Sequence, residues 1–150
     1  MRLEYFQMID KVERLDLAAR TIACTCEVPV TSTVFEGHFP GHPLLPGTIM
    51  VEVIAQCCGL LVVAHQDFAK IPVLIGVEKA KIRAMVPPGA VLAAEGRLVQ
   101  EGTLYAAAAG ALHYEGRKVA EAEIRLGTIP FPSENLRQEA RSFARKIGLI

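Results

Sequence analysis

The sequence has no net charge and few aromatic side chains. Its 150 residues contain 16 Lys and Arg against 16 Asp and Glu, no Trp, and only 6% aromatic residues. A balanced charge gives no general reason to expect binding to nucleic acid or to an acidic membrane. The length predicts a single domain, because a chain of this size can bury about 70% of its unfolded surface.

Segments for export or membrane insertion are also lacking. No basic stretch followed by an apolar one opens the sequence, so we expect no secretory signal and a cytoplasmic protein. The most apolar window, residues 49–64, is short for a membrane span and contains Glu52 and Gln56. The cysteines do not have the spacing of a zinc site or a redox motif, and we expect them to be reduced and buried. They are Cys24, Cys26, Cys57 and Cys58.

One stretch combines irregular backbone with residues that can do chemistry. Residues 37–47 hold three Gly and three Pro around His38 and His42. Pro fixes φ and lacks an N–H, and Gly opens positive φ, so this composition predicts a loop without regular structure. From Thr48 onward the chain is continuously apolar except at Glu52 and Gln56. A rigid loop with histidine thus leads into a buried helix with a carboxylate, and these are the groups of general acid–base catalysis.

The apolar segment is predicted to be a buried helix over about residues 47–65. Thr48, Glu52 and Gln56 are spaced four apart, so they lie along one stripe of that helix. The other side chains are nearly all apolar, which is typical of a helix buried all round. An unpaired buried carboxylate is costly, so Glu52 is either partnered, protonated or catalytic. The structural alternative is a satisfied carboxylate bonded to Gln56.

The loop histidines admit two further interpretations. His38 and His42 have the spacing of a helical zinc pair, but the intervening Pro40 disfavours a helix. No third cluster of ligands accompanies them, so we expect no metal site. Both could instead be loop residues with backbone hydrogen bonds. That interpretation suits His42, which directly precedes Pro43, better than it suits His38.

The loop and helix together resemble a known family. The segments 37–43 (Gly-His-Phe-Pro-Gly-His-Pro), 46–47 (Pro-Gly) and 55–56 (Ala-Gln), with Glu52 between them, are similar to the FabZ family of 3-hydroxyacyl-(acyl-carrier-protein) dehydratases. The resemblance covers about residues 5 to 128. It implies an α+β hotdog fold, in which an antiparallel sheet wraps around a central buried helix, here with an added C-terminal helix.

The resemblance assigns catalytic roles to His38, Glu52 and Gly47. Dehydration of a 3-hydroxyacyl thioester needs a base for the C2 proton, an acid for the departing hydroxyl and a donor to the thioester oxygen. A neutral imidazole at His38 suits the base, and an apolar surround favours a protonated Glu52 as the acid. The Gly47 N–H at the helix start would stabilise the oxyanion. The expected substrate-binding residues are Phe39, Pro40, Thr48 and Gln56.

Partners and assembly are likewise implied by the resemblance. Acyl carrier protein would deliver the substrate, and no cofactor is expected. The family forms a homodimer, or a trimer of such dimers, in which His38 and Glu52 of one site come from different subunits. An apolar tunnel beside the helix would accept the acyl chain, lined by Ile54, Leu60 and Leu61. Two alternatives stay open: another acyl-thioester hydratase or a thioesterase, and a non-catalytic module that binds acyl chains.

Alternating and turn-bounded segments predict the remaining elements. We expect strands over residues 5–13, 21–28, 72–84, 91–100, 104–114 and 118–127. Ser133 is predicted to cap a final helix. The chain therefore divides into a dehydratase domain, residues 1–130, and a helical extension, residues 131–150.

The extension combines an apolar face with a basic one. The apolar face is predicted to consist of Leu136, Ala140, Phe143, Ala144 and Ile147. The basic face is either a solvated surface or a docking patch for acyl carrier protein, and it consists of Arg137, Arg141, Arg145 and Lys146. A second basic group competes for the docking role, namely Lys79, Lys81 and Arg83.

Overall fold

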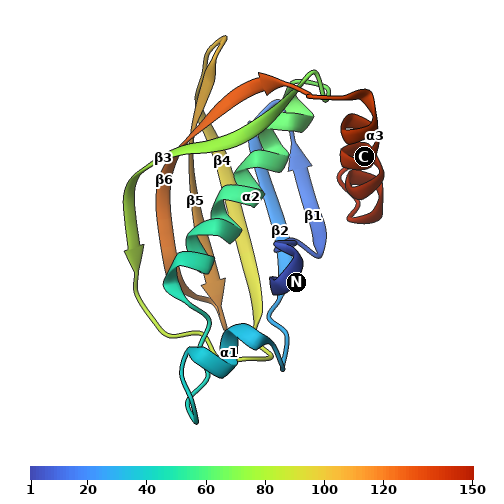
Figure 1. Cartoon of the computed structure of the whole chain (residues 1–150). Helices are drawn as coiled ribbons and strands as arrows, with labels where there is room; N and C mark the ends of the chain where they lie inside the picture. Colours follow the sequence, from blue (N-terminus) through green and yellow to red (C-terminus); the bar gives the residue numbers. More distant parts are fainter.

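The computed structural model describes residues 1–150 and shows one antiparallel sheet wrapped around a long helix (Figure 1). The sheet has six strands in the order β1-β2-β4-β5-β6-β3. The strands are β1 Lys11–Asp16, β2 Thr21–Glu27, β3 Lys70–Ile82, β4 Val91–Glu101, β5 Tyr105–Tyr114 and β6 Arg117–Pro130. The helices are α1 Thr33–Gly37, α2 Gly47–His65 and α3 Glu134–Lys146, with a 3-10 turn at Leu3–Tyr5. The expected sheet around a central helix and the added C-terminal helix are confirmed.

The sheet buries one face against α2. Along β4, every second side chain from Leu92 to Leu98 is buried and the residues between them are exposed. This alternation follows from the period of two in a strand. On α2, the buried residues include Val53, Ile54 and Leu61, none of which has any exposed surface. The core is therefore the interface between the concave face of the sheet and one side of α2.

Two glycines let α2 lie close to the sheet. Gly96 on β4 pairs with Gly110 on β5, directly beneath the helix. A Cβ atom at Gly110 would lie 2.7 Å from Ile54 Cγ2 and 2.8 Å from the Glu95 carbonyl oxygen. One at Gly96 would lie 3.0 Å from Cys58 Sγ. A side chain at Gly110 would therefore displace its neighbours, and one at Gly96 would press against Cys58.

The helix α2 is long and apolar enough to span a membrane by length and composition alone. Most of its apolar side chains, however, are buried within this chain, against the sheet that wraps around it. Burial in the core therefore accounts for the hydropathy of this segment.

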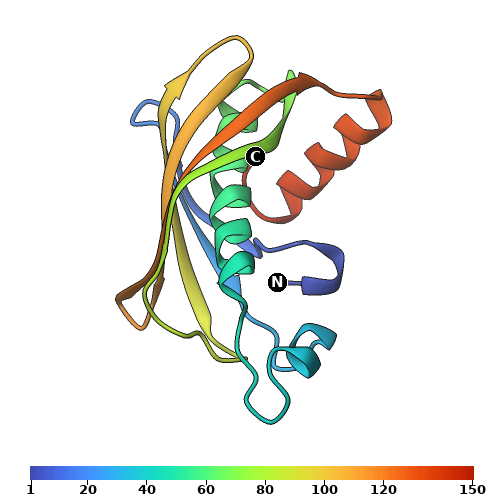
Figure 2. The same ribbon diagram turned by 60° about the vertical axis from the view of Figure 1, so that its left-hand side comes forward.

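The C-terminal helix packs on the opposite side of α2 from the sheet (Figure 2). Its N-cap is Ser133, as predicted, whose side-chain oxygen accepts a hydrogen bond from the Leu136 N–H at 3.2 Å. The Val12 N–H donates to the Ile147 carbonyl oxygen at 2.7 Å, which ties the end of the helix to β1. The Arg141 guanidinium donates to the Asp67 carbonyl oxygen at 3.1 Å, in the turn after α2. The predicted apolar face is confirmed, since Ala144 and Ile147 are buried in the main core.

The prediction of a first strand over residues 5–13 is wrong in its first half. Phe6 adopts φ 53° and ends the 3-10 turn, and β1 begins only at Lys11. Met8 and Ile9 are buried in the core, and the Met8 N–H donates to the Gln56 side-chain oxygen at 3.0 Å. The segment is thus held by a side chain of α2 and not by a neighbouring strand, a contact that periodicity does not reveal.

Helix α1 was not predicted at all. It has five residues, too few to show a helical period. Ser32 caps it by accepting a hydrogen bond from the Val34 N–H at 3.1 Å. The Glu4 carboxylate accepts hydrogen bonds from the Ser32 hydroxyl at 2.7 Å and from the Thr33 N–H at 3.2 Å. A tertiary contact to the N-terminal turn therefore supports this helix.

Candidate active site

The histidine loop is a rigid connection between α1 and α2. The His38 N–H donates to the Val34 carbonyl oxygen at 3.0 Å, and the Leu44 N–H donates back to the His38 carbonyl oxygen at 2.9 Å. At the tip of the loop, the His42 N–H donates to the Phe39 carbonyl oxygen at 2.9 Å. The His38–Phe39 peptide bond is cis. As the Gly and Pro content predicted, no regular structure forms between α1 and α2.

The His38 ring is held in one tautomer. Its Nδ1 lies 3.1 Å from the Leu44 carbonyl oxygen. A carbonyl oxygen only accepts hydrogen bonds, so Nδ1 carries the proton in this contact and Nε2 keeps a free lone pair. The ring also stacks on Phe39 with a centroid distance of 4.1 Å. A fixed imidazole with a free Nε2 is arranged as a proton acceptor.

His38 lines a cavity of about 460 Å³ at the start of α2. Seven of the ten lining residues are apolar, and Gly47 contributes backbone. Neither the Gly47 nor the Thr48 N–H donates a hydrogen bond within the chain. A Cβ atom at Gly47 would lie 3.0 Å from Ile82 Cγ1, which explains the absence of a side chain there. The cavity therefore brings the His38 imidazole close to unpaired N–H groups at the positive end of a helix.

Glu52 lines a second cavity, of about 270 Å³, which is enclosed by α2, by residues of β3 and β6, and by the C-terminal helix. The Gln56 Nε2 donates to Glu52 Oε1 at 2.8 Å and to the Phe6 carbonyl oxygen at 2.8 Å, while Gln56 Oε1 accepts from the Met8 N–H. The hydrogen bond between Glu52 and Gln56 matches the structural alternative. These contacts use both the oxygen and the nitrogen of the Gln56 amide and fix its orientation. The hydrogen bond from Gln56 therefore holds the Glu52 carboxylate in place.

The seven predicted site residues fall into three groups. His38, Phe39 and Gly47 line the first cavity, and Glu52 and Gln56 line the second. Pro40 and Thr48 are exposed and line neither cavity. Within one chain, no hydrogen bond joins His38 to Glu52. His38 and Glu52 of one chain therefore line two different cavities.

Of the three residues predicted to line an acyl tunnel, only Leu60 lines a cavity of the structure. Leu60 lines the Glu52 cavity, but Ile54 and Leu61 are fully buried between α2 and the sheet. Their positions on the helix explain the error. Ile54 packs over Gly110, on the side of α2 opposite the stripe that contains Glu52 and Gln56.

The cysteines and His42 do not contribute to either cavity. All four cysteines are free and buried, as predicted. Burial raises the pKa of the Cys58 thiol to about 12 and also raises the pKa of Cys26. These groups are thiols and not nucleophilic thiolates. His42 is exposed and engaged through its backbone, and no three His, Cys, Asp or Glu side chains are close enough to hold a metal ion.

Most of the basic residues considered for docking are paired within the chain. On α3, Arg137 pairs with Glu134, and Arg141 pairs with Asp67. On β3 and just after it, Lys79 pairs with Glu123, and Arg83 pairs with Glu121. Arg83 also lines the His38 cavity. Lys81, Arg145 and Lys146 make no ion pair.

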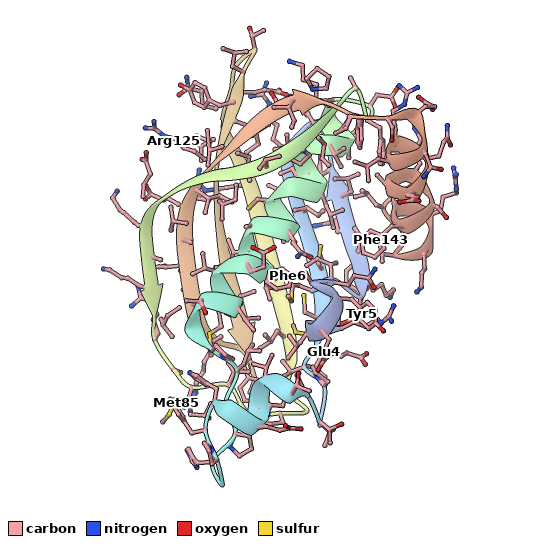
Figure 3. All side chains as sticks on the ribbon, in the orientation of Figure 1. Glu4, Tyr5, Phe6, Met85, Arg125 and Phe143 are labelled. Carbon is pink, nitrogen blue, oxygen red and sulfur yellow. The ribbon has the colours of Figure 1, made fainter.

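Sequence reasoning missed two sets of lining residues. The first set closes the His38 cavity and includes Leu44, Met50, Ile82 and Met85. The second set closes the Glu52 cavity from the C-terminal extension and consists of Phe131, Ala140 and Phe143. Figure 3 labels Met85 at the lower left of the molecule and Phe143 on its right-hand side. The apolar face of α3 indicated that this helix packs against the domain and could have identified the second set. No local pattern in the sequence, however, indicated that α3 lies over α2.

Comparison with known proteins gives concordant results. The family model described as "FabA-like domain" matches residues 2–123. A 3-hydroxyacyl-(acyl-carrier-protein) dehydratase FabZ from Enterococcus faecalis is 36% identical over 120 residues, which cover 79% of this chain and 84% of that protein. The FabZ dehydratase from Clostridium acetobutylicum is 34% identical over 118 residues, covering 78% and 83%.

Solved structures with the same architecture include proteins that are not named as dehydratases. A putative thioesterase from Ralstonia eutropha superposes with a TM-score of 0.63 at 16% identity, covering 77% of this chain and 82% of that one. A hypothetical protein from Staphylococcus aureus gives a TM-score of 0.66 at 15% identity, covering 86% and 98%. At such identities these similarities establish the fold alone, and they confirm the hotdog architecture.

Proposed function

Because the chain belongs to the FabA-like family and matches its FabZ dehydratases over most of their length, we propose that it is a 3-hydroxyacyl-(acyl-carrier-protein) dehydratase. It is a hydro-lyase that removes water from a 3-hydroxyacyl thioester to form the trans-2-enoyl thioester in fatty acid or related lipid biosynthesis. Acyl carrier protein carries the substrate. We place the reaction in the cytoplasm.

The tautomer of His38 is the observation that carries the proposal. Donation from Nδ1 to the Leu44 carbonyl leaves Nε2 to abstract the C2 proton, inside a cavity that also contains the start of α2. The N–H of Gly47 then donates to the thioester oxygen as it becomes enolate-like. Glu52 supplies the proton that leaves with the C3 hydroxyl as water. A non-catalytic acyl binder has no use for a histidine held in this way.

The test must separate dehydration from thioester hydrolysis, since putative thioesterases share the fold. Incubation with crotonyl-pantetheine is expected to remove the ultraviolet absorbance of the enoyl thioester as water adds across the double bond. A thiol reagent in a parallel sample is expected to detect no released pantetheine. Release of thiol at the same rate as the loss of absorbance would identify a thioesterase. If carrier-protein thioesters were neither hydrated nor hydrolysed, acyl binding would be the only activity left to the protein.

We propose further that two copies of the chain complete the site. The strand β3 is an edge strand, and five of its large apolar side chains are exposed in the single chain. They are Val73, Leu74, Ile75, Val77 and Ile82. The opposite edge, β1, carries mainly charged residues. An exposed apolar edge invites pairing with another strand, and a second copy of β3 satisfies both its backbone and its side chains.

Antiparallel pairing of two β3 strands would bring the half-sites together. Ile82, at the end of β3, lines the His38 cavity, whereas Ile71 and Pro72, near its start, line the Glu52 cavity. If Val77 faces its own copy across the two-fold axis, Ile82 lies beside Pro72 of the second copy, because both are equally far from Val77. His38 of one chain then approaches Glu52 of the other. A trimer of such dimers is compatible with this arrangement.

The acidic carrier protein is proposed to dock beside the His38 cavity. Arg83 lies in the cavity wall and Lys81 is exposed nearby without an ion pair. Positive charge at this position attracts the carrier and directs its thioester arm toward His38. Arg145 and Lys146 at the end of α3 are the alternative docking group.

A further inference from the structure

The Glu52 cavity has a wall that does not belong to the family domain. The family match ends at residue 123, whereas Phe131, Ala140 and Phe143 lie beyond it and line the cavity. The facing wall is the stripe of α2 that contains Glu52 and Leu60. Figure 2 shows α3 on the far side of α2 from the sheet, and the cavity lies between the two helices, with residues of β3 and β6 along its side.

The cavity has the chemistry of an acyl-chain subsite. Ten of its fourteen lining residues are apolar, and its polar side chains, Glu52 and Gln56, bond to each other. An apolar pocket with a few polar groups at one place is typical of small-molecule sites. The occupant is the hydrocarbon tail of the substrate, because the C3 hydroxyl must reach Glu52 and the tail extends from that carbon.

The wall formed by the extension is fixed in place. The Arg141 guanidinium donates to the Asp67 carbonyl oxygen and lies 4.6 Å from the centroid of the Phe68 ring, which is itself buried. At the C-terminal end of α3, the Ile147 carbonyl oxygen accepts a 2.7 Å hydrogen bond from the Val12 N–H, and Leu149 is buried. Movement of α3 away from α2 would break these contacts. The residues of α3 that line this cavity of about 270 Å³ are therefore anchored to the rest of the fold.

We propose that residues 131–150 act as the end wall of the acyl subsite, and that Phe143 with Phe131 limits the length of the acyl chain. This inference rests on the proposed function, since it takes the acyl thioester as the ligand. It assigns to the extension a role in substrate selection: the protein accepts short-chain 3-hydroxyacyl groups and excludes long ones. Figure 3 shows Phe143 on α3, beside the body of the fold.

The test is a binding series with S-alkyl-pantetheine thioethers from butyl to dodecyl, measured by calorimetry. In the wild type, each methylene that enters the cavity is expected to raise the affinity about fourfold, until the chain meets the aromatic wall and the affinity falls. In Phe143→Ala, the affinity maximum is expected to move to chains longer by about two methylenes or more, because truncation leaves a cavity. Phe131→Ala is a second variant with the same expected direction.

The matched control is Leu136→Ala, which shortens a half-buried apolar residue of the same helix outside the cavity. It is expected to keep the wild-type length profile. An unchanged maximum in both Phe variants, or an equal shift in Leu136→Ala, would overturn the inference, as would a failure of every thioether to bind. Thioethers cannot react, so the series gives its answer independently of turnover. Absent turnover with intact length selection would count against the proposed function alone.

Discussion

Replacement of His38 by alanine is expected to lower kcat for crotonyl-pantetheine hydration by about 10²–10⁴-fold, the usual contribution of a general base. The ring is the only imidazole in the cavity at the start of α2, and its Nδ1 contact to Leu44 leaves Nε2 free. The substrate binds mainly through its pantetheine arm and acyl chain, so KM is expected to change little. A loss confined to kcat is the pattern of a group that acts in the transition state.

His42 provides the matched control for this variant. It is in the same loop, four residues further on, but its side chain is exposed and lines neither cavity. His42→Ala is expected to retain near wild-type kcat, and circular dichroism of both variants should match the wild type. If His38→Ala retained full turnover while folded, His38 could not be the base.

The second large effect is expected from Glu52→Gln, with kcat reduced by about 10²–10⁴-fold for loss of the general acid. Glutamine has the same shape and can still hydrogen-bond to Gln56, so the tether to Phe6 and Met8 can persist. A neutral amide, however, cannot release a proton to the departing hydroxyl. The structural interpretation of Glu52 predicts the opposite, a variant that is less stable but turns over normally when folded.

Urea denaturation, which measures the stability of each variant, is combined with the measurement of kcat to distinguish these two interpretations of Glu52. A glutamate on α1 serves as control, since Glu36 is exposed and lines neither cavity. Glu36→Gln is expected to leave both the stability and kcat near the wild-type values. A stable Glu52→Gln with unchanged kcat would contradict the acid role.

The elements with strong local signals could be predicted from the sequence. The stripe of Glu52 and Gln56 on an otherwise apolar segment indicated α2, and the Gly and Pro content of residues 37–47 indicated the rigid loop. The strands β4 and β5 followed from alternation and turn residues. In each case the physical cause is local, being either a period or a restriction on φ.

The features that were missed depend on contacts between distant segments. The Leu44 carbonyl that orients His38 is a backbone atom, which no residue pattern identifies. The 3-10 turn that replaces the predicted strand start is fixed by the side chain of Gln56, nearly fifty residues away. Ile54 was placed in the tunnel because helix burial alone does not tell which side meets the sheet. The position of Phe143 over α2 likewise follows from tertiary anchoring of α3.

The most direct test of the shared site mixes the two inactive variants. His38→Ala and Glu52→Gln are purified separately, mixed in equal amounts, exchanged through mild denaturation and assayed for crotonyl-pantetheine hydration. If His38 and Glu52 act from different chains, half of the dimers are mixed and each contains one intact site, so about a quarter of the wild-type activity returns. Activity that stays at the level of the single variants, with subunit exchange verified by mass-labelled chains, would contradict a site built from two copies.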